Sequence, residues 1–127
     1  MLFRSIPLED VPAAIAARDI GVAPTRRDPF TDISLSTKIF EYGAMGKPAI
    51  CSRLPMVERT FPLGTAWTYA PGDAADLAAA ILAAVDDPAA REAAVVRTRA
   101  IVDGLAWERE SVAYVRIVEQ LIGRRAG

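Results

Sequence analysis

Short apolar runs alternate with amphipathic stretches along the first half of the chain. A short run of apolar residues bounded by polar or turn residues predicts a buried strand, whereas apolar residues spaced by three and four predict a helix. Strands that alternate with helices form parallel βαβ units, so the pattern predicts an α/β fold. The expected strands are Ile20–Ala23, Ala49–Ser52 and Ala66–Tyr69. One expected helix precedes them, from Pro12 to about Arg18, and another lies between the first two, from Thr37 to Met45.

The second half of the chain is predicted to be helical. Pro71-Gly72-Asp73 begins one helix, Asp87-Pro88 provides a cap and a proline for the next, and Trp107 starts the last. We expect the last apolar stripe, together with Trp107, to be core and a brace between domains. The inward stripes are predicted as Leu77, Ile81 and Val85; then Ala94, Val95, Thr98, Ile101 and Val102; then Tyr114, Val115, Val118, Leu121 and Ile122.

The helix that begins at Thr37 has two features of interest. Serine and threonine oxygens before it can cap the unpaired N–H groups of its first turn. The same N–H groups, at the positive end of the helix dipole, also bind phosphate, so the sequence leaves both a cap and an anion site open. Gly43 inside so short a helix is unfavourable, and we interpret it as a position of close packing against another backbone. Gly46 suits a left-handed C-cap.

The composition argues against several kinds of partner and functional site. The 127 residues include 15 Lys and Arg against 16 Asp and Glu, with a net charge of −1 and no basic stripe, which argues against nucleic acid as the main partner. The absence of histidine and the single Cys51 argue against a zinc site or a histidine-based triad. Cys51, expected to be an inert apolar filler, suits a reducing cytoplasm. No signal peptide or apolar run of the ~20 residues that span a bilayer is present, and we expect a cytoplasmic location without a transmembrane segment.

In parallel sheets, ligands bind beyond the carboxyl ends of the strands. Leu2–Arg4 is expected to be the end of a further strand. The segments that follow strands are Arg4–Ile6, Pro24–Ser36 and Arg53–Glu58, which we expect to be loops around one site.

The stretch STKIFEYGAMGKPAICS resembles the nucleotide-sugar-binding segment of GT-B glycosyltransferases of family 4. The order of the flanking motifs strengthens the resemblance. Upstream lies IPLEDVPAAIAARDIGVAP; downstream lie Glu58, GTAWTYAPGDAADLAAAILAAVDDPAAR and the late WE at Trp107-Glu108. No single motif is diagnostic, but together, in this order and spacing, they indicate the family.

The resemblance implies that residues 1–127 are a single partial domain. It would be the donor-binding, C-terminal part of the enzyme, with a partial doubly wound, Rossmann-like parallel sheet of three or four strands. The implied activity is transfer of a sugar from a UDP- or GDP-linked donor with retention, without metal or cofactor. The family's N-terminal domain, which binds a sugar or lipid-linked acceptor, is not in this sequence, so we expect the isolated chain to be inactive.

The resemblance also assigns candidate residues for the donor. Glu41 matches a glutamate that hydrogen-bonds the ribose hydroxyls, although a glutamate is also favoured near a helix N-terminus. Its paired glutamate falls at Ile33, which cannot bond a sugar, and Asp32 is the possible substitute or simply a turn former. Glu58 matches a loop near the donor sugar, or is a surface residue.

The remaining candidates concern the phosphates and the base. Ser34, Leu35, Ser36 and Thr37 match a turn whose N–H groups face the diphosphate, with capping alone as the alternative. Lys38 would neutralise a phosphate or be a solvated lysine. Arg4, Ser5 and Ile6 match a strand end that contacts the nucleobase through its main chain.

Two other classes of function remain. One is a non-catalytic α/β module that binds nucleotide weakly or docks to a partner chain. The other is a receiver-like domain, which fits the length of the chain. Its chemistry is poorly supported, because the acidic pair Asp86-Asp87 lies in a predicted turn between helices. A three-strand core would also leave the edge at Ile20–Ala23 without a neighbour, so we expect possible association through this exposed sheet edge.

Overall fold

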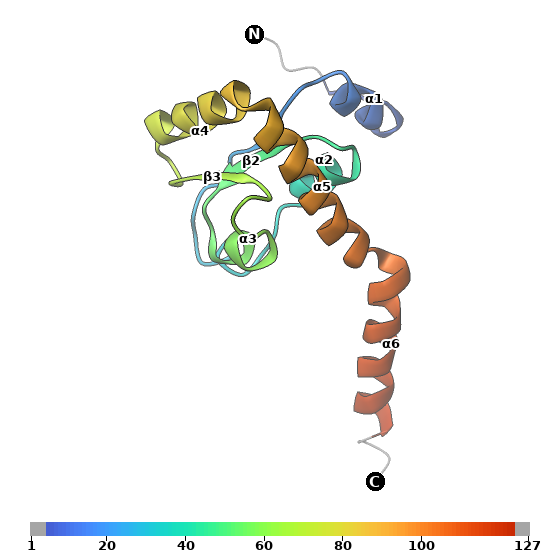
Figure 1. Cartoon of the computed structure of the whole chain (residues 1–127). Helices are drawn as coiled ribbons and strands as arrows, with labels where there is room; N and C mark the ends of the chain where they lie inside the picture. Colours follow the sequence, from blue (N-terminus) through green and yellow to red (C-terminus); the bar gives the residue numbers. More distant parts are fainter. Residues whose placement is uncertain (1–4, 124–127) are drawn as a thin grey trace.

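The computed structural model describes residues 5–123, which fold as a layer of three parallel strands with helices on both faces (Figure 1). The strands are β1 (Gly21–Ala23), β2 (Ala49–Ser52) and β3 (Trp67–Tyr69), in the order β1-β2-β3. Val22 lies opposite Ile50, and Cys51 lies opposite Thr68. The predicted α/β class and the three predicted strands are therefore confirmed. The expected strand at Leu2–Arg4 lies outside the described residues.

The helices follow the predicted order, with two additions, at Leu8–Asp10 and Pro55–Thr60. The segment 53–58, expected to be a loop, instead enters a short helix because Pro55 occupies its first turn and Val57 anchors it in the core. The helical elements are η1 (Leu8–Asp10), α1 (Val11–Ala16), α2 (Thr37–Ala44), α3 (Pro55–Thr60), α4 (Ala74–Asp86), α5 (Pro88–Gly104) and α6 (Trp107–Gly123).

The core lies on the two faces of the sheet. All four residues of β2 are buried because this central strand is covered on both faces. Successive side chains of a strand point to opposite faces, so Ile50 packs with Ala84 of α4, whereas Cys51 packs with Ile39 of α2. These two clusters fix α2 and α4 on opposite faces of the sheet.

The buried stripe of α4 differs from the expected one by one position. Leu77 and Ile81 pack against the sheet, and Ala84 is fully buried. Val85, expected to face inward, is 49% exposed. In a helix this rich in alanine, small residues fit the close approach to the sheet, so the apolar pattern alone misplaced the end of the stripe.

Gly43 marks the contact between α2 and α5. A Cβ at this position would lie 2.8 Å from Thr98 Cγ2 and 2.9 Å from Val102 Cγ2. Close packing at Gly43 is confirmed, but the neighbours are side chains of α5 rather than another backbone. Thr98 is buried and donates a hydrogen bond to the Thr65 carbonyl oxygen, which ties α5 to the segment before β3.

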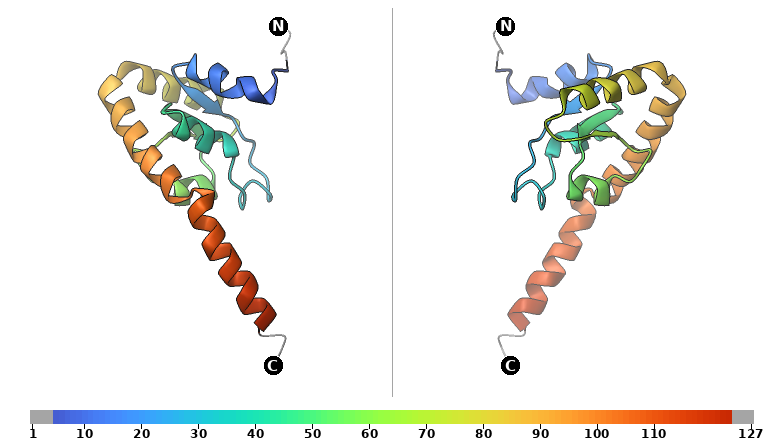
Figure 2. Two further views of the ribbon diagram at one scale, coloured as in Figure 1. Left: turned by 90° about the vertical axis from the view of Figure 1, so that its right-hand side faces the viewer. Right: turned by 90° about the vertical axis from the view of Figure 1, so that its left-hand side faces the viewer.

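The last helix does not join the core. Figures 1 and 2 show α6 extending away from the rest of the molecule, and none of its residues is buried. The expectation that its stripe forms core was wrong for the described chain. The exposed apolar side chains of α6 are Trp107, Val112, Tyr114, Val115, Ile117, Val118, Leu121 and Ile122.

The open edge of β1 is partly covered by Tyr42 of α2. A Cβ at Gly21 would lie 2.3 Å from the Tyr42 ring, so only glycine leaves room for it. The phenol donates a hydrogen bond of 3.3 Å to the Val22 carbonyl oxygen. Burial, together with the neighbouring Glu41 carboxylate, raises the pKa of Tyr42, so this hydroxyl keeps its proton and remains a donor. In residues 5–123, no helix is long and apolar enough to cross a membrane.

Candidate functional site

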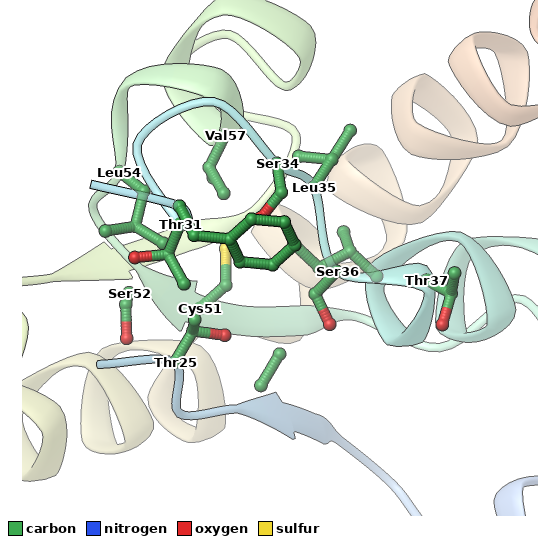
Figure 3. Close-up of a pocket in the computed structure, with 13 residues that line it drawn as sticks. Thr25, Thr31, Ser34, Leu35, Ser36, Thr37, Cys51, Ser52, Leu54 and Val57 are labelled. Carbon is green, nitrogen blue, oxygen red and sulfur yellow. The ribbon is translucent and has the colours of Figure 1, made fainter. Parts of the chain in front are cut away.

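A cavity of about 340 Å³ lies where β1 and β2 end, bounded by the loop from β1 to α2 (Figure 3). The chain turns away from the sheet at this edge, which leaves the carboxyl ends of the strands open to a ligand. The lining residues are Ala23, Thr25, Phe30, Thr31, Ser34, Leu35, Ser36, Thr37, Ile39, Cys51, Ser52, Leu54 and Val57.

The lining combines hydroxyl groups with an apolar floor and includes no charged side chain. Ile39, Leu54 and Val57 are buried residues of the core. The hydroxyls come from Thr25, Thr31, Ser34, Ser36, Thr37 and Ser52. Such neutral groups can both donate and accept hydrogen bonds, so the wall suits a polar ligand with several hydroxyls.

The first turn of α2 forms one side of the cavity. Ser36 is the N-cap of α2, with extended backbone angles (φ −70°, ψ 124°), yet its side chain makes no capping hydrogen bond. By contrast, Asp73 accepts from two backbone N–H groups at the start of α4, and Asp87 accepts from the Ala90 N–H at the start of α5. The N–H groups that open α2 are therefore left without a side-chain acceptor, an arrangement that favours an anion.

The loop from β1 to α2 is held in shape by its own polar side chains. The Asp28 N–H donates to Thr31 Oγ1, and the Thr31 N–H donates to Asp28 Oδ1, each at 2.8 Å. Thr31 Oγ1 also donates to the Arg26 carbonyl oxygen at 2.9 Å. Asp32 forms an ion pair with Arg27 at 3.0 Å. These bonds keep Thr31 and Phe30 on the cavity wall.

The structure brings some of the candidate residues together at the cavity. Ser34, Leu35, Ser36 and Thr37 all line it. Lys38 is exposed on the first turn of α2 and does not line the cavity.

Glu41 is exposed one turn beyond Thr37. Residues four apart on a helix are neighbours on the same side, so Glu41 lies on the same side of α2 as Thr37, but it does not line the cavity.

The other candidates lie away from the lining. Asp32 is engaged with Arg27 rather than lining the cavity. Glu58, on α3, is exposed and does not contribute to the wall. Ile6 is 47% exposed, precedes η1 and also does not line the cavity. Arg4 lies outside the described residues.

The sequence interpretation missed several lining residues. Thr25, Phe30 and Thr31 belong to a loop that was identified only as a whole, and Cys51 and Ser52 were identified only as strand residues. The signal for Ser52 was present, because the last residue of a central parallel strand faces the ligand edge. Its hydroxyl forms a 3.1 Å hydrogen bond with the Tyr69 hydroxyl, which links the ends of β2 and β3.

Cys51 lies on the wall but is not a nucleophile at neutral pH. Burial raises the pKa of its thiol to about 12, so the thiolate is scarce. Among residues 5–123, no group of three His, Cys, Asp or Glu side chains could hold a metal ion.

Comparisons with known proteins agree with this architecture. A family model described as "Glycosyl transferases group 1" matches residues 3–87. Among solved structures, sucrose-phosphate synthase from Thermosynechococcus elongatus is similar, with a TM-score of 0.80 and 26% sequence identity. The match covers 94% of this chain and 29% of that chain, so this chain spans less than a third of its relative. No curated protein matches the chain.

Proposed function

Because the chain belongs to the group 1 glycosyltransferases, we propose that it is the donor-binding portion of a GT-B enzyme and holds a nucleotide-sugar at the cavity beside α2. The observation that carries this proposal is the uncapped first turn of α2, which opens onto a wall of hydroxyl groups. The N–H groups of this turn would donate hydrogen bonds to the diphosphate, since anions are stabilised at the positive end of a helix. Lys38, in the same turn, would supply a full positive charge.

Glu41 would fix the ribose of the donor. A carboxylate accepts hydrogen bonds from two neighbouring hydroxyls at once, and Glu41 stands on the Thr37 side of α2. In this proposal the donor is UDP- or GDP-linked, and the sugar is transferred with retention and without a metal ion. Assignment to family 4 is part of the proposal and rests on the motif that contains Glu41.

The acceptor would bind to a part of the enzyme that this chain does not include. Group transfer requires donor and acceptor to be held in reacting geometry, and the chain spans 29% of the sucrose-phosphate synthase relative. We therefore expect the isolated chain to bind a donor nucleotide without transferring sugar.

Calorimetric titration with UDP, GDP and ADP tests the proposal. Glu41→Gln should weaken binding of the preferred nucleotide by about 1–3 kcal/mol, the range for loss of a charged hydrogen bond. Glu92→Gln, on an exposed position of α5, is the matched control and should bind as the unmodified chain does. Absence of binding to all three nucleotides, or equal binding by the two variants, would overturn the site assignment and favour the non-catalytic module.

A further inference from the structure

A second cavity, of about 410 Å³, lies between β3 and α5. It shares no lining residue with the cavity beside α2. Its size falls within the range of small-molecule sites. The lining residues are Arg53, Leu63, Gly64, Ala66, Trp67, Thr68, Ala90, Ala94 and Arg97, which include two guanidinium groups and no carboxylate.

Arg97 is held in a fixed position on this wall. Its Nε donates a 2.8 Å hydrogen bond to the Gly64 carbonyl oxygen. Gly64 has a positive φ of 87°, and a Cβ there would lie 3.2 Å from Arg97 Nη2, so the guanidinium lies close over a residue without a side chain. In the part of the chain that the structure describes, no carboxylate forms an ion pair with Arg97. Its terminal N–H groups therefore carry a charge that lacks a protein counterion.

Arg53 supplies the second positive charge. Its Nε donates to Thr68 Oγ1 at 3.5 Å, and its Nη2 lies 3.9 Å from Asp76 Oδ2. Both contacts are long, and the side chain is about half exposed, so Asp76 offsets this charge only weakly. The cavity as a whole is therefore electropositive.

Apart from the two arginines, Gly64 and Thr68, the residues that line the cavity are apolar. Trp67 is partly buried at the start of β3, and Ala90 and Ala94 leave space on the α5 side. Leu63 is fully exposed, at 102% of its reference area. An indole ring beside small residues accommodates a planar group by stacking, while the guanidinium groups select an anion.

We propose that this second cavity binds a small organic anion, with a planar apolar body against Trp67 and a carboxylate or phosphate paired with Arg97 and Arg53. Guanidinium groups bind either head through two parallel hydrogen bonds. The site is separate from the donor cavity, and the inference does not depend on the proposed function.

The indole N–H resonance of Trp67 reports on this cavity directly. In a Trp107→Phe background, Trp67 is the remaining tryptophan, and the replaced residue is exposed on α6. We expect saturable shifts of this resonance on titration with 4-chlorobenzoate or phenyl phosphate, and none with the neutral 4-chlorobenzamide. The tighter of the two anions identifies the preferred head group.

Arginine variants test which charge is responsible. Arg97→Gln should weaken binding at least about fivefold, as expected for loss of a charge-assisted hydrogen bond, and Arg53→Gln should weaken it less. Arg99→Gln is the matched control: Arg99 also lies on α5 and donates to a backbone carbonyl, that of Ala44, but does not line the cavity. It should leave the affinity unchanged. Thermal unfolding of each variant confirms that the fold is intact.

Three results would each overturn the inference. Equal shifts with the benzoate and the benzamide would show that the cavity is merely apolar. The same loss of affinity in Arg97→Gln and Arg99→Gln would show a non-specific response to charge. Absence of any shift at millimolar probe would show that the cavity binds neither anion.

Discussion

Replacing Gly43 by alanine tests the contact that positions α2 and, with it, the wall of the cavity beside α2. Alanine is favoured over glycine in a helix by about 1 kcal/mol. At Gly43, however, the new Cβ would lie 2.8 Å from Thr98 Cγ2 and 2.9 Å from Val102 Cγ2. Overpacking of this kind costs about 1–3 kcal/mol, which offsets or exceeds the helix gain.

Gly104, at the end of α5, provides the reference. A Cβ there meets nothing within 4 Å, so Gly104→Ala carries the helix gain without a clash. The free energy of unfolding should therefore be lower for Gly43→Ala than for Gly104→Ala by about 1–3 kcal/mol. For a chain of this size that difference corresponds to roughly 4–12 °C in Tm, which circular dichroism during heating measures directly.

A second substitution identifies the source of the loss. Thr98→Ser removes Cγ2 but keeps the hydroxyl that donates to the Thr65 carbonyl oxygen. In the Gly43→Ala background it should restore part of the lost stability, whereas in the unmodified chain it should destabilise by leaving a small cavity. Equal changes in the free energy of unfolding for Gly43→Ala and Gly104→Ala would refute the reasoning. The same effect of Thr98→Ser with and without Gly43→Ala would refute it as well.

Three further predictions concern the caps, the buried thiol and the last helix. Asp73→Ala should lower the free energy of unfolding by about 1 kcal/mol, because the Asp73 side chain caps α4. Ser36→Ala should lower it much less, because Ser36 makes no capping bond. Urea unfolding of both variants measures the two free energies. The unfolded Cys51 thiol loses its proton near pH 9.0 and the folded one near pH 12, so the free energy of unfolding should fall as pH rises through this interval. Cys51→Ala should reduce that fall without abolishing it, because the pKa of Tyr42 is also raised in the folded chain, and an equal fall in the variant and the unmodified chain would contradict the burial of the thiol. Ending the chain after Ala106 should leave Tm nearly unchanged, because no α6 residue is buried, and should reduce the binding of a hydrophobic dye; a large drop in Tm would show that α6 supports the core.

The strands could be predicted because each consists of a few apolar residues closed by a proline, a polar residue or a turn. The same logic failed for α3, where the six residues Pro55–Thr60 are too few to show a helical period. It failed again at Val85, since a helix rich in alanine can bury small residues where the pattern favours large ones. For α6 the spacing correctly indicated an apolar stripe, but a stripe does not specify its partner.

The candidate site was predictable to the extent that it follows from strand ends and a helix start. Ser34, Ser36 and Thr37 line the cavity because they lead directly into α2. Contributions that depend on the path of the loop, such as Phe30, could not be read from spacing. The ion pair that engages Asp32 with Arg27 likewise depends on a turn formed by Asp28 and Thr31.

The Tyr42 hydroxyl also limits how the sheet can grow. The backbone N–H and C=O groups of Gly21 and Ala23 point toward β2, as the hydrogen bond from the Gly21 N–H to the Pro48 carbonyl oxygen shows. The backbone groups of Val22, between them, therefore point toward the open edge. An added strand would need the Val22 carbonyl oxygen, which Tyr42 already occupies. Such a strand would compete with the Tyr42 hydroxyl for this acceptor, and Tyr42 belongs to α2, whose first turn forms the cavity wall. Growth of the sheet at β1 would therefore change the surroundings of a side chain on the same helix that borders the cavity.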